Sequence, residues 1–353
     1  MSIHNFTGCL LLGALGDTLG FKNGFWEFYD CKDNYDSIIK EFDKLGGYKN
    51  IDLKNWNISD DTLLTLATAN GILKKTDRET FMKKEFIECY KKYALNSNIN
   101  RYFGTTTLDK IEQLIDGRKY EKFKFQESDG GSGCAMRTMP IGLYYHKKEN
   151  INSLIYYSFI NSILTHTHPM AYLGGIVVAL FTSFAIQKKP IERWITKMLK
   201  IFNDKNNILI KTLKKMNKID IYYEYKNTFF SYWVKYYYLR FKKGKYVPNN
   251  KWTNLQYRMD YFIEHFEPGS GWLGSTGTGA VLYSYDSLLL AKNDFQKLIY
   301  LTCLSCGDSD TLGMISCSLW GAYYNYNNVP KHLLKNIELK GDIIKISKKL
   351  YNK

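Results

Sequence analysis

The sequence predicts an all-α fold, and three observations support this class. Apolar residues recur with helical spacing through most of the 353 residues, alternating strand patterns are scarce, and several expected helices begin at capping residues. A chain of this length with 45% hydrophobic residues can bury a substantial core. The chemical motifs are distributed over most of the chain, so we expect one domain over residues 1–353.

Start signals mark several of the expected helices. Asp60 and Asp61 precede one apolar-periodic stretch. Pro169 and Pro190 stand in the first turns of two others, where a missing N–H is tolerated. In chain order, the expected helices cover about 6–19, 61–75, 79–94, 134–146, 151–164, 170–188, 190–203, 278–292, 294–305, 309–325 and 340–351.

The charge balance favours a solvated surface over nucleic-acid recognition. Lys and Arg number 49 against 34 Asp and Glu, for a net charge of +15, but most of these cations are Lys. Arginine is the side chain suited to bidentate phosphate and base contacts, so we expect no specific nucleic-acid binding. The seven cysteines lack the density of a small secreted scaffold and favour a reducing, cytoplasmic location, with Cys303 and Cys306 as buried thiols.

Residues 204–262 differ from the rest of the chain in composition, because they are rich in Lys, Tyr and Asn. The favoured interpretation is a set of amphipathic helices that pack aromatic side chains inward and keep Lys in water. The alternative is an aromatic and basic stacking surface for a nucleic-acid strand. We expect no domain boundary here, because chemical motifs lie on both sides.

No segment of the sequence indicates a targeting signal or a membrane span. The apolar stretch Phe6 to Leu19 lacks a basic flank and contains Asp17, which argues against a signal peptide. The longest apolar run, Ala171 to Ile186, is shorter than the ~20 residues that a spanning helix needs. Both are expected to be buried helices of a protein with no membrane partner.

Two acidic clusters lie far apart in the sequence, each at the expected N-terminus of an apolar helix. They are Ser59-Asp60-Asp61-Thr62 and Asp308-Ser309-Asp310-Thr311. Helix capping explains either cluster alone, because these residue types are favoured caps and acids complement the helix dipole. Together they suggest a metal site, because four carboxylates brought close would repel one another without a cation. An oxygen-only set suits Mg²⁺, which keeps waters in its shell and can offer one to a substrate.

Gly-rich stretches accompany these clusters. Residues 12–20 place small residues along the first helix, which permits close helix packing. The stretches 128–133 and 269–279 each lead into an expected helix, where backbone N–H groups are suited to a phosphate, although plain turns explain such loops more often. His166 and His168 precede another helix at a spacing that does not indicate zinc; positioning a ligand or capping the helix is expected.

Five motifs together identify a family resemblance. They are GCLLLGALGDTLG, SDDTLLTLATA, GSGCAMRTMPIGL, THTHPMAYLGG and CGDSDTLGMISCSLWGAYY. In their order and spacing the chain resembles the ADP-ribosylglycohydrolase family from about Gly8 to Tyr324. It is most similar to the ADP-ribosylarginine hydrolases, because of NGFWEF at 23–28, the LGGYKNIDLKNWNISDDT approach to the first acidic pair, and GWLGS before the last motif.

The resemblance implies a mostly orthogonal all-α bundle with two Mg²⁺ ions, or Mn²⁺, in a central cleft. The residues that match the family's metal ligands by position are Ser59, Asp60, Asp61, Asp308, Asp310 and Thr311. Those that match its substrate-binding regions are Ser128, Asp129, Gly130, Gly131, Ser132, Gly133, Arg137, Thr165, His166, Gly269, Trp272, Ser275, Asp308 and Ser309. Glu27 is expected near the metal site, as a similarly placed Glu is in some relatives.

The implied activity is removal of ADP-ribose from modified arginine side chains of proteins. Water would attack C1 of the distal ribose while the bond to the guanidinium nitrogen breaks, with Asp60 or Asp61 as the catalytic acid/base residue. The expected partners are ADP-ribose and mono-ADP-ribosylated proteins, and the chain is expected to be a monomer. Hydrolysis of serine-linked or O-acetyl-ADP-ribose, or ADP-ribose binding with weak catalysis, are the alternatives.

One departure from the arginine-hydrolase pattern concerns Thr278 and Gly279. They stand where that pattern resembles a His and an Asp. If those groups contact the distal ribose or the guanidinium, substrate preference or rate would differ here. The complete metal-ligand set still favours an active enzyme.

Overall fold

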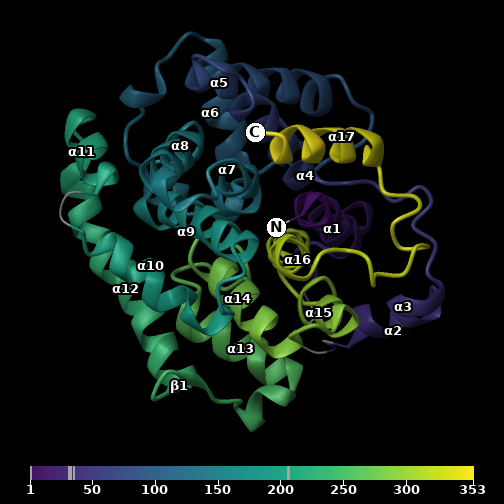
Figure 1. Ribbon diagram of the computed structural model, residues 1–353. Coiled ribbons are helices and arrows are strands. Elements are labelled where there is room, and N and C mark those ends of the chain that lie inside the picture. Colours follow the sequence, from purple (N-terminus) through teal and green to yellow (C-terminus); the bar gives the residue numbers. More distant parts are fainter. Residues whose placement is uncertain (1, 31–33, 35, 205–206) are drawn as a thin grey trace.

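The fold is almost entirely helical, as Figure 1 shows. The computed structural model describes residues 2–30, 34, 36–204 and 207–353. Their α-helices are α1 (Ile3–Phe21), α2 (Ser37–Lys44), α3 (Gly47–Asn50), α4 (Asp60–Ile72), α5 (Arg78–Cys89), α6 (Thr105–Ile115), α7 (Met139–Tyr144), α8 (Ile151–Ile163), α9 (Pro169–Ile186), α10 (Trp194–Phe202), α11 (Ile208–Lys215), α12 (Ile219–Arg240), α13 (Leu255–Phe266), α14 (Gly279–Ala291), α15 (Phe295–Thr302), α16 (Ser309–Tyr324) and α17 (Lys340–Tyr351). Two short strands, β1 (Phe241–Lys242) and β2 (Lys245–Tyr246), form an antiparallel hairpin. The all-α prediction is confirmed.

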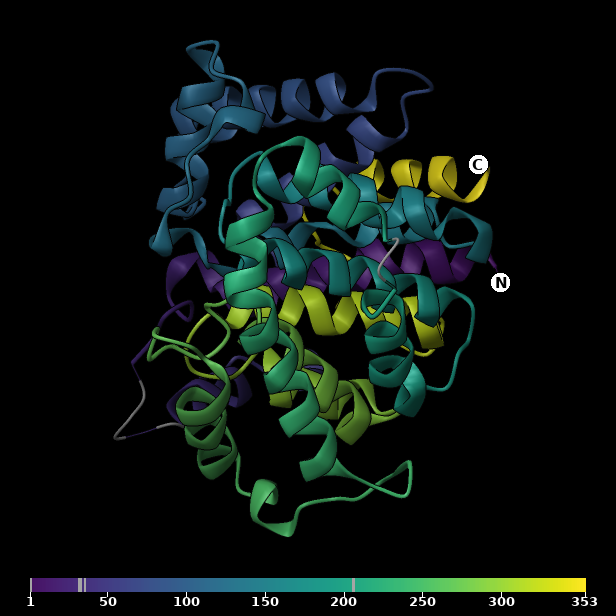
Figure 2. The ribbon, with the colours of Figure 1, turned by 90° about the vertical axis from the view of Figure 1, so that its left-hand side faces the viewer.

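Helices α1 and α16 form the centre of the molecule and lie against each other in opposite directions (Figure 2). A Cβ atom on Gly16 would lie 2.2 Å from the carbonyl oxygen of Gly313, and one on Gly20 would lie 2.3 Å from that of Ser309. This approach is therefore open only to glycine at both positions. The close packing expected from residues 12–20 is confirmed, and it brings the N-terminus of α16 beside the end of α1.

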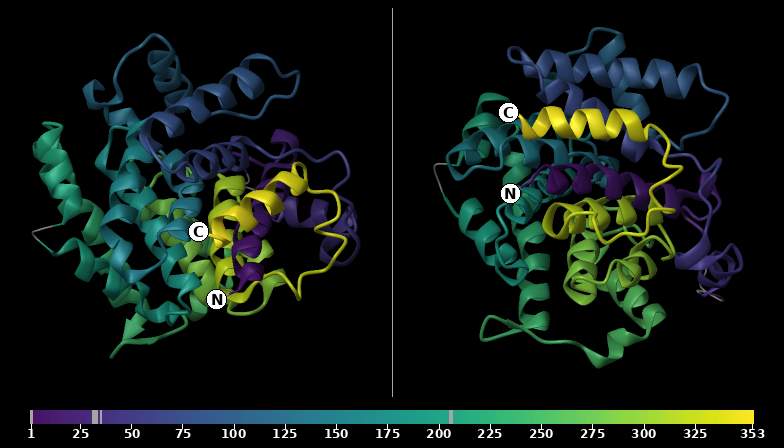
Figure 3. Two further views of the ribbon diagram at one scale, coloured as in Figure 1. Left: turned by 45° about the horizontal axis from the view of Figure 1, so that its top comes forward. Right: turned by 45° about the vertical axis from the view of Figure 1, so that its right-hand side comes forward.

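The apolar run in the middle of the chain forms α9, and all 18 residues of this helix are buried. By length and composition α9 is the one helix of the described residues that could cross a membrane. Since neighbouring helices cover it on every side, the expectation of a buried core helix is confirmed. Around this core, Figure 3 shows both termini on one side of the molecule, with α17 lying along α1.

The Lys- and Tyr-rich region folds mainly into α11, α12 and α13, which flank the core in Figure 1. Helix α12 buries one face through Tyr222, Phe229 and Trp233, whereas its lysines are not buried. The favoured interpretation of amphipathic helices is confirmed.

Two sequence-based expectations about local structure are wrong. The single helix expected over 134–146 is a 3₁₀ helix, η5 (Ser132–Arg137), followed after Thr138 by α7. Pro140 explains the break, because proline is tolerated in the first turn of a helix but not in its interior. Cys303 is a buried free thiol as expected, but Cys306 is partly exposed and disulfide-bonded.

Candidate active site

The two acidic clusters meet at one cleft of about 190 Å³. The N-terminus of α4 contributes Asp60 and Asp61, and the N-terminal end of α16 contributes Asp308 and Thr311. The other residues that line this acidic cleft are Glu27, Phe28, Tyr102, Gly104, Thr105, Thr106, Thr107, Gly131, Ser132, Gly133, Met136, His166 and Ser275. The expected convergence of the clusters is therefore present in the structure.

The tip of α4 is held from within by a carboxylate of α1. Ser59 caps the helix by accepting a hydrogen bond from the backbone N–H of Asp61, at 3.2 Å. Asp17 is fully buried and accepts hydrogen bonds from the backbone N–H groups of Ser59 and Thr62, at 3.0 and 3.1 Å, and from the Thr62 hydroxyl. Our sequence interpretation assigned Asp17 no role, although an acid inside an apolar glycine-rich helix needs partners.

The tip of α16 is tied both to α1 and to a glycine-rich loop. The Ser309 hydroxyl donates to the carbonyl oxygen of Gly20, at 2.8 Å, so this side chain faces α1 and does not line the cleft. The Ser132 hydroxyl donates to Asp308 Oδ2, also at 2.8 Å. Asp310 is buried, does not line the cleft and accepts a hydrogen bond from the backbone N–H of Thr311.

Burial and mutual repulsion leave these carboxylates poorly compensated. Burial, with repulsion from Asp310, raises the pKa of Asp60 and of Asp61 well above the usual value. Burial also raises the pKa of Asp308 to about 6. Among the described residues, Glu27 Oε2 and Asp61 Oδ2 are buried with no hydrogen-bond partner. A cation at this cleft would relieve both the repulsion and the missing contacts.

The donor set therefore has the chemistry of a hard divalent cation, because it consists of carboxylate and hydroxyl oxygens. The side chains are nevertheless not placed as a finished coordination shell. Among the described residues, no group of three His, Cys, Asp or Glu side chains is arranged to hold one metal ion.

The two later glycine-rich stretches are joined to each other beside the cleft. The N–H of Ser132 donates to the carbonyl oxygen of Ser275, and the N–H of Gly277 donates to that of Gly130, both at 3.0 Å. Gly131 and Thr276 form the bridge between them. Segments far apart in the sequence thus build one wall, and these two N–H groups are not available to a phosphate.

Comparison with known proteins identifies this architecture. The family model described as ADP-ribosylglycohydrolase matches residues 2–353. The chain belongs to the ADP-ribosylglycohydrolase family. It is similar to ADP-ribosylhydrolase ARH1 of Dictyostelium discoideum, with 32% identity over 99% of this chain and 94% of that protein. It is also similar to ADP-ribosylhydrolase ARH3 of Homo sapiens, with 22% identity over 96% and 90% of the two chains.

A solved ADP-ribosylglycohydrolase-related protein complex shares the fold, with a TM-score of 0.62, 18% identity and coverage of 99% and 98%. This similarity at full length supports the all-helical architecture of the family. As a member of the ADP-ribosylglycohydrolase family, the chain is a hydrolase, and the family acts on ADP-ribosylated substrates.

A second cleft, of about 550 Å³, adjoins the acidic cleft, and Gly131 and Ser275 line both. Its other lining residues are Glu127, Ser128, Gly130, His168, Met170, Tyr225, Thr228, Pro268, Gly269, Ser270 and Thr276. The His168 and Tyr225 rings contact each other with centroids 4.4 Å apart. His168 Nδ1 also accepts the N–H of Met170, so the capping role considered for this histidine is present.

Other expected substrate-binding residues lie away from the cleft surface. Arg137 is fully buried and donates to the Thr165 hydroxyl, at 2.7 Å, and neither residue lines either cleft. Asp129 is also buried, accepts a hydrogen bond from the Thr167 hydroxyl and forms an ion pair with Lys110. These side chains hold the walls of the site, and their expected contact with ADP-ribose stays a prediction.

Glu267 is a buried carboxylate that holds the second glycine-rich loop, and the sequence interpretation missed it. It accepts hydrogen bonds from the N–H of Gly274 and from the N–H and hydroxyl of Thr276, and burial raises its pKa to about 8. A Cβ atom on Gly279 would lie 2.0 Å from this carboxylate. Gly279, noted above as a departure from the arginine-hydrolase pattern, therefore leaves the space that Glu267 occupies.

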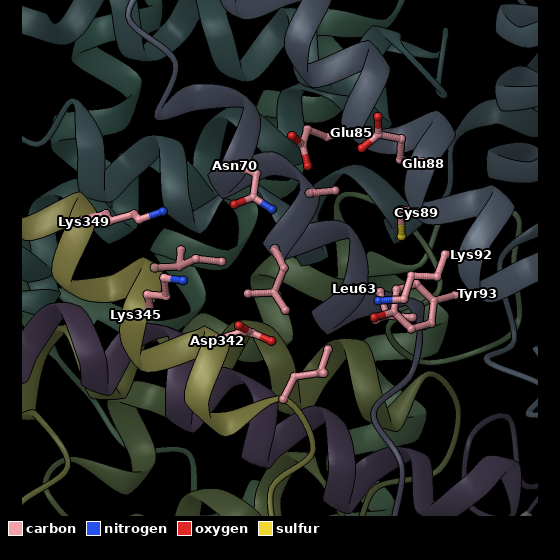
Figure 4. A pocket seen from close by; sticks show the side chains of 14 residues that line it. Leu63, Asn70, Glu85, Glu88, Cys89, Lys92, Tyr93, Asp342, Lys345 and Lys349 are labelled. Carbon is pink, nitrogen blue, oxygen red and sulfur yellow. The ribbon is translucent and has the colours of Figure 1, made fainter.

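A further pocket, of about 310 Å³, lies between α4, α5 and α17 and is shown in Figure 4. It combines Glu85, Glu88 and Asp342 with Lys92, Lys345 and Lys349 over an apolar floor. None of the expected site residues lines it. The acidic cleft, where the motif residues converge, is therefore the candidate active site.

Proposed function

We propose that this chain removes ADP-ribose from modified arginine side chains of proteins and that it requires Mg²⁺. The observation that carries the proposal is the convergence of four carboxylates, those of Glu27, Asp60, Asp61 and Asp308, at one cleft beside a glycine-rich wall. A fifth carboxylate, that of Asp310, is buried next to Asp308. Similarity to ADP-ribosylhydrolase ARH1 over nearly the whole of both chains supports an ADP-ribosyl substrate.

The two adjoining clefts suit the two ends of ADP-ribose. The distal ribose would occupy the acidic cleft, where Thr311 and the carboxylates offer oxygens to its hydroxyl groups. The adenosine end would extend past Gly131 and Ser275 into the wider cleft, where the His168 and Tyr225 rings supply apolar surface. The linkage to the protein would then point out of the acidic cleft into solvent.

Two Mg²⁺ ions, or Mn²⁺ in their place, would be held by Ser59, Asp60, Asp61, Asp308, Asp310 and Thr311. The unpartnered Asp61 oxygen and the repulsion that raises the pKa of the neighbouring acids support this assignment. When bound, the metal supplies positive charge that offsets the carboxylates and polarises substrate oxygens.

The reaction needs a base for the attacking water and an acid for the leaving group. Asp60 or Asp61 would accept a proton from the attacking water as the water oxygen bonds to C1 of the distal ribose. The C1–N bond breaks as the C1–O bond forms, and the same carboxyl group returns a proton to the leaving guanidine nitrogen. Both aspartates line the cleft, and Asp61 has an oxygen with no other partner among the described residues.

A release assay tests this function directly. Wild-type protein should release ADP-ribose from arginine-linked substrate faster than from serine-linked or acetyl-linked substrate, and chelation of Mg²⁺ should abolish release. Asp60→Ala and Asp308→Ala should each lose on the order of 100-fold or more in rate, because they remove acid/base and charge-stabilising groups. Asp220→Ala, on an exposed part of α12, is the matched control.

Two outcomes would contradict the proposal. Full activity of both cleft variants would remove the metal hypothesis. Binding of ADP-ribose without release from any linkage, with or without Mg²⁺, would identify the chain as an ADP-ribose-binding protein.

A further inference from the structure

Two aromatic side chains at the mouth of the acidic cleft have no part in the chemistry described above. Phe28 and Tyr102 line the cleft, yet they are 40% and 44% exposed. Apolar ring surface is thus presented to water next to a cluster of buried carboxylates. In the proposed function, this mouth is where the modified side chain of the target protein would enter.

Both residues also adopt a backbone conformation that bulky side chains rarely adopt. The φ angle is 52° at Phe28 and 54° at Tyr102, and no other aromatic residue in the described ranges has a positive φ. Backbone strain of this kind is costly and is concentrated at functional sites. Two strained, exposed aromatic residues at one cleft therefore indicate a role in binding.

Neighbouring residues hold each of the two rings in place. The N–H of Phe28 donates to the carbonyl oxygen of Gly307, at 2.7 Å, and its ring meets Trp272 edge-on with centroids 5.8 Å apart. The Tyr102 ring meets Phe21 edge-on at 5.5 Å. A Cβ atom on Gly24 would lie 2.6 Å from the Tyr102 ring, so the glycine leaves room for that ring. The rings are positioned, although they are not buried.

The chemistry of the mouth distinguishes the possible leaving groups. A guanidinium is planar and positively charged, so it is attracted to aromatic rings and to the carboxylates beneath them. Serine-linked and acetyl-linked groups are neutral and gain neither attraction. We propose that Phe28 and Tyr102 form the subsite that receives the guanidinium of ADP-ribosylated arginine and thereby favour this linkage. This inference rests on the proposed function, which it deepens by assigning residues to the leaving group.

The test uses Phe28→Ala and Tyr102→Ala, with Phe28→Tyr and Tyr102→Phe as conservative variants. Tyr238→Ala is the matched control, because Tyr238 is an aromatic residue of α12 with 77% exposure. For arginine-linked ADP-ribosyl peptide, kcat/KM should fall about tenfold in each Ala variant, the size of a cation–π contact. The conservative variants and the control should keep the wild-type value, and the Kd for free ADP-ribose should not change.

A second measurement separates the effect of the positive charge of the guanidinium from the effect of its planar shape. Binding of N-methylguanidinium and of its neutral isostere N-methylurea is followed by NMR in protein saturated with ADP-ribose. The Ala variants should weaken the binding of N-methylguanidinium and leave that of N-methylurea unchanged. An equal effect on both compounds, or no effect of either variant on binding and kcat/KM, would overturn the subsite.

The two proposals fail in different ways. If wild-type protein releases no ADP-ribose from arginine, the proposed function fails; dependence of N-methylguanidinium binding on the two rings would still support a cation subsite. If wild-type protein is active on arginine linkages but the two Ala variants match it in every measurement, the subsite fails and the function stands.

Discussion

Asp17 connects the packing of the central helices with the geometry of the acidic cleft. It lies on α1 next to Gly16, at the point where α1 closely approaches α16. From there it accepts hydrogen bonds from the backbone of Ser59 and Thr62 at the tip of α4. Burial and the nearby Asp310 raise its pKa to about 7. One carboxylate thus fixes where the first acidic cluster stands relative to the second.

Replacement of Asp17 by Ala should therefore affect both stability and activity. Two backbone N–H groups and the Thr62 hydroxyl would lose their acceptor, and each unsatisfied buried donor costs about 1–3 kcal/mol. We expect the free energy of unfolding, measured in urea, to fall by about 2–4 kcal/mol, and the release rate to fall with it. Thr62→Val, which removes one of the three donors, should show a smaller effect. Unchanged stability of Asp17→Ala would contradict this role.

The residue scale also shows why part of the site could be predicted. Asp60, Asp61 and Asp308 stand at helix starts, where clustered acids are visible in the sequence. The sequence does not reveal the roles of Glu267 and Asp17, because their hydrogen-bond donors lie elsewhere in the chain. The donors to Glu267 lie in a loop seven or more residues away. Those to Asp17 lie at the tip of a helix more than 40 residues away. The available signal for Asp17 was its place among apolar and small residues, since a buried carboxylate must find donors.

At the scale of elements, a buried ionic cluster attaches the Lys- and Tyr-rich region to the core. Asp286 of α14 accepts hydrogen bonds from Arg240 of α12 and Arg258 of α13, each at 2.9 Å, and from the Tyr236 hydroxyl. All four side chains are fully buried. Two of the few arginines therefore serve to hold these helices together.

Removal of Asp286 should destabilise this attachment strongly. Asp286→Ala would leave two buried guanidinium groups without their carboxylate, a change that typically costs about 3–5 kcal/mol. We expect a loss of this size in the free energy of unfolding, measured with a chemical denaturant. Glu224→Ala, an exposed acid on α12, should change it by less than about 0.5 kcal/mol. A similar stability for both variants would contradict the proposed attachment.

The existence of helices was easier to predict than their ends. The long periodic stretches at α1, α4, α9 and α16 all form helices, because an apolar face of that length has few other ways to be buried. The break before α7 depends on Pro140, and helix α6 has no counterpart among the expected helices. In these cases local chemistry and tertiary packing decided the structure more than the apolar period did.

At the scale of the whole molecule, the acidic cleft is a property of tertiary structure. Its lining residues come from the segment after α1, from α4, α6, η5 and α16, and from the loops before α6, η5, α9 and α14, which are distributed over the whole chain. The spacing of the motifs along the sequence identifies the segments that contribute to the cleft but does not show that these segments are in contact. Contact follows from the close approach of α1 to α16 and from the backbone bonds that join the two glycine-rich loops.

Because the carboxylates of the acidic cleft lie close together, they repel one another in the folded, metal-free protein. Burial raises the pKa of Asp308 to about 6 and that of Asp17 to about 7, from an ordinary value near 3.8. A raised pKa means that the folded protein holds protons that the unfolded chain releases. Their stabilising contribution is fully present below about pH 4 and is lost as the pH rises through 6 to 7. Above that range, the Mg²⁺ of the proposed function would offset the charge that the protons no longer neutralise.

Mg²⁺ should therefore stabilise the protein, and more so at high pH. At 100 times its Kd a single bound ion adds about 2.7 kcal/mol, so Tm should rise by several degrees at pH 8 and much less at pH 5. Differential scanning calorimetry with NaCl at equal ionic strength as the control measures this difference. Asp308→Asn should reduce the shift at pH 8, because it removes one charge that the ion would neutralise. An equal shift at both pH values, or an undiminished shift in the variant, would place the bound ion elsewhere than at the carboxylates of this cleft.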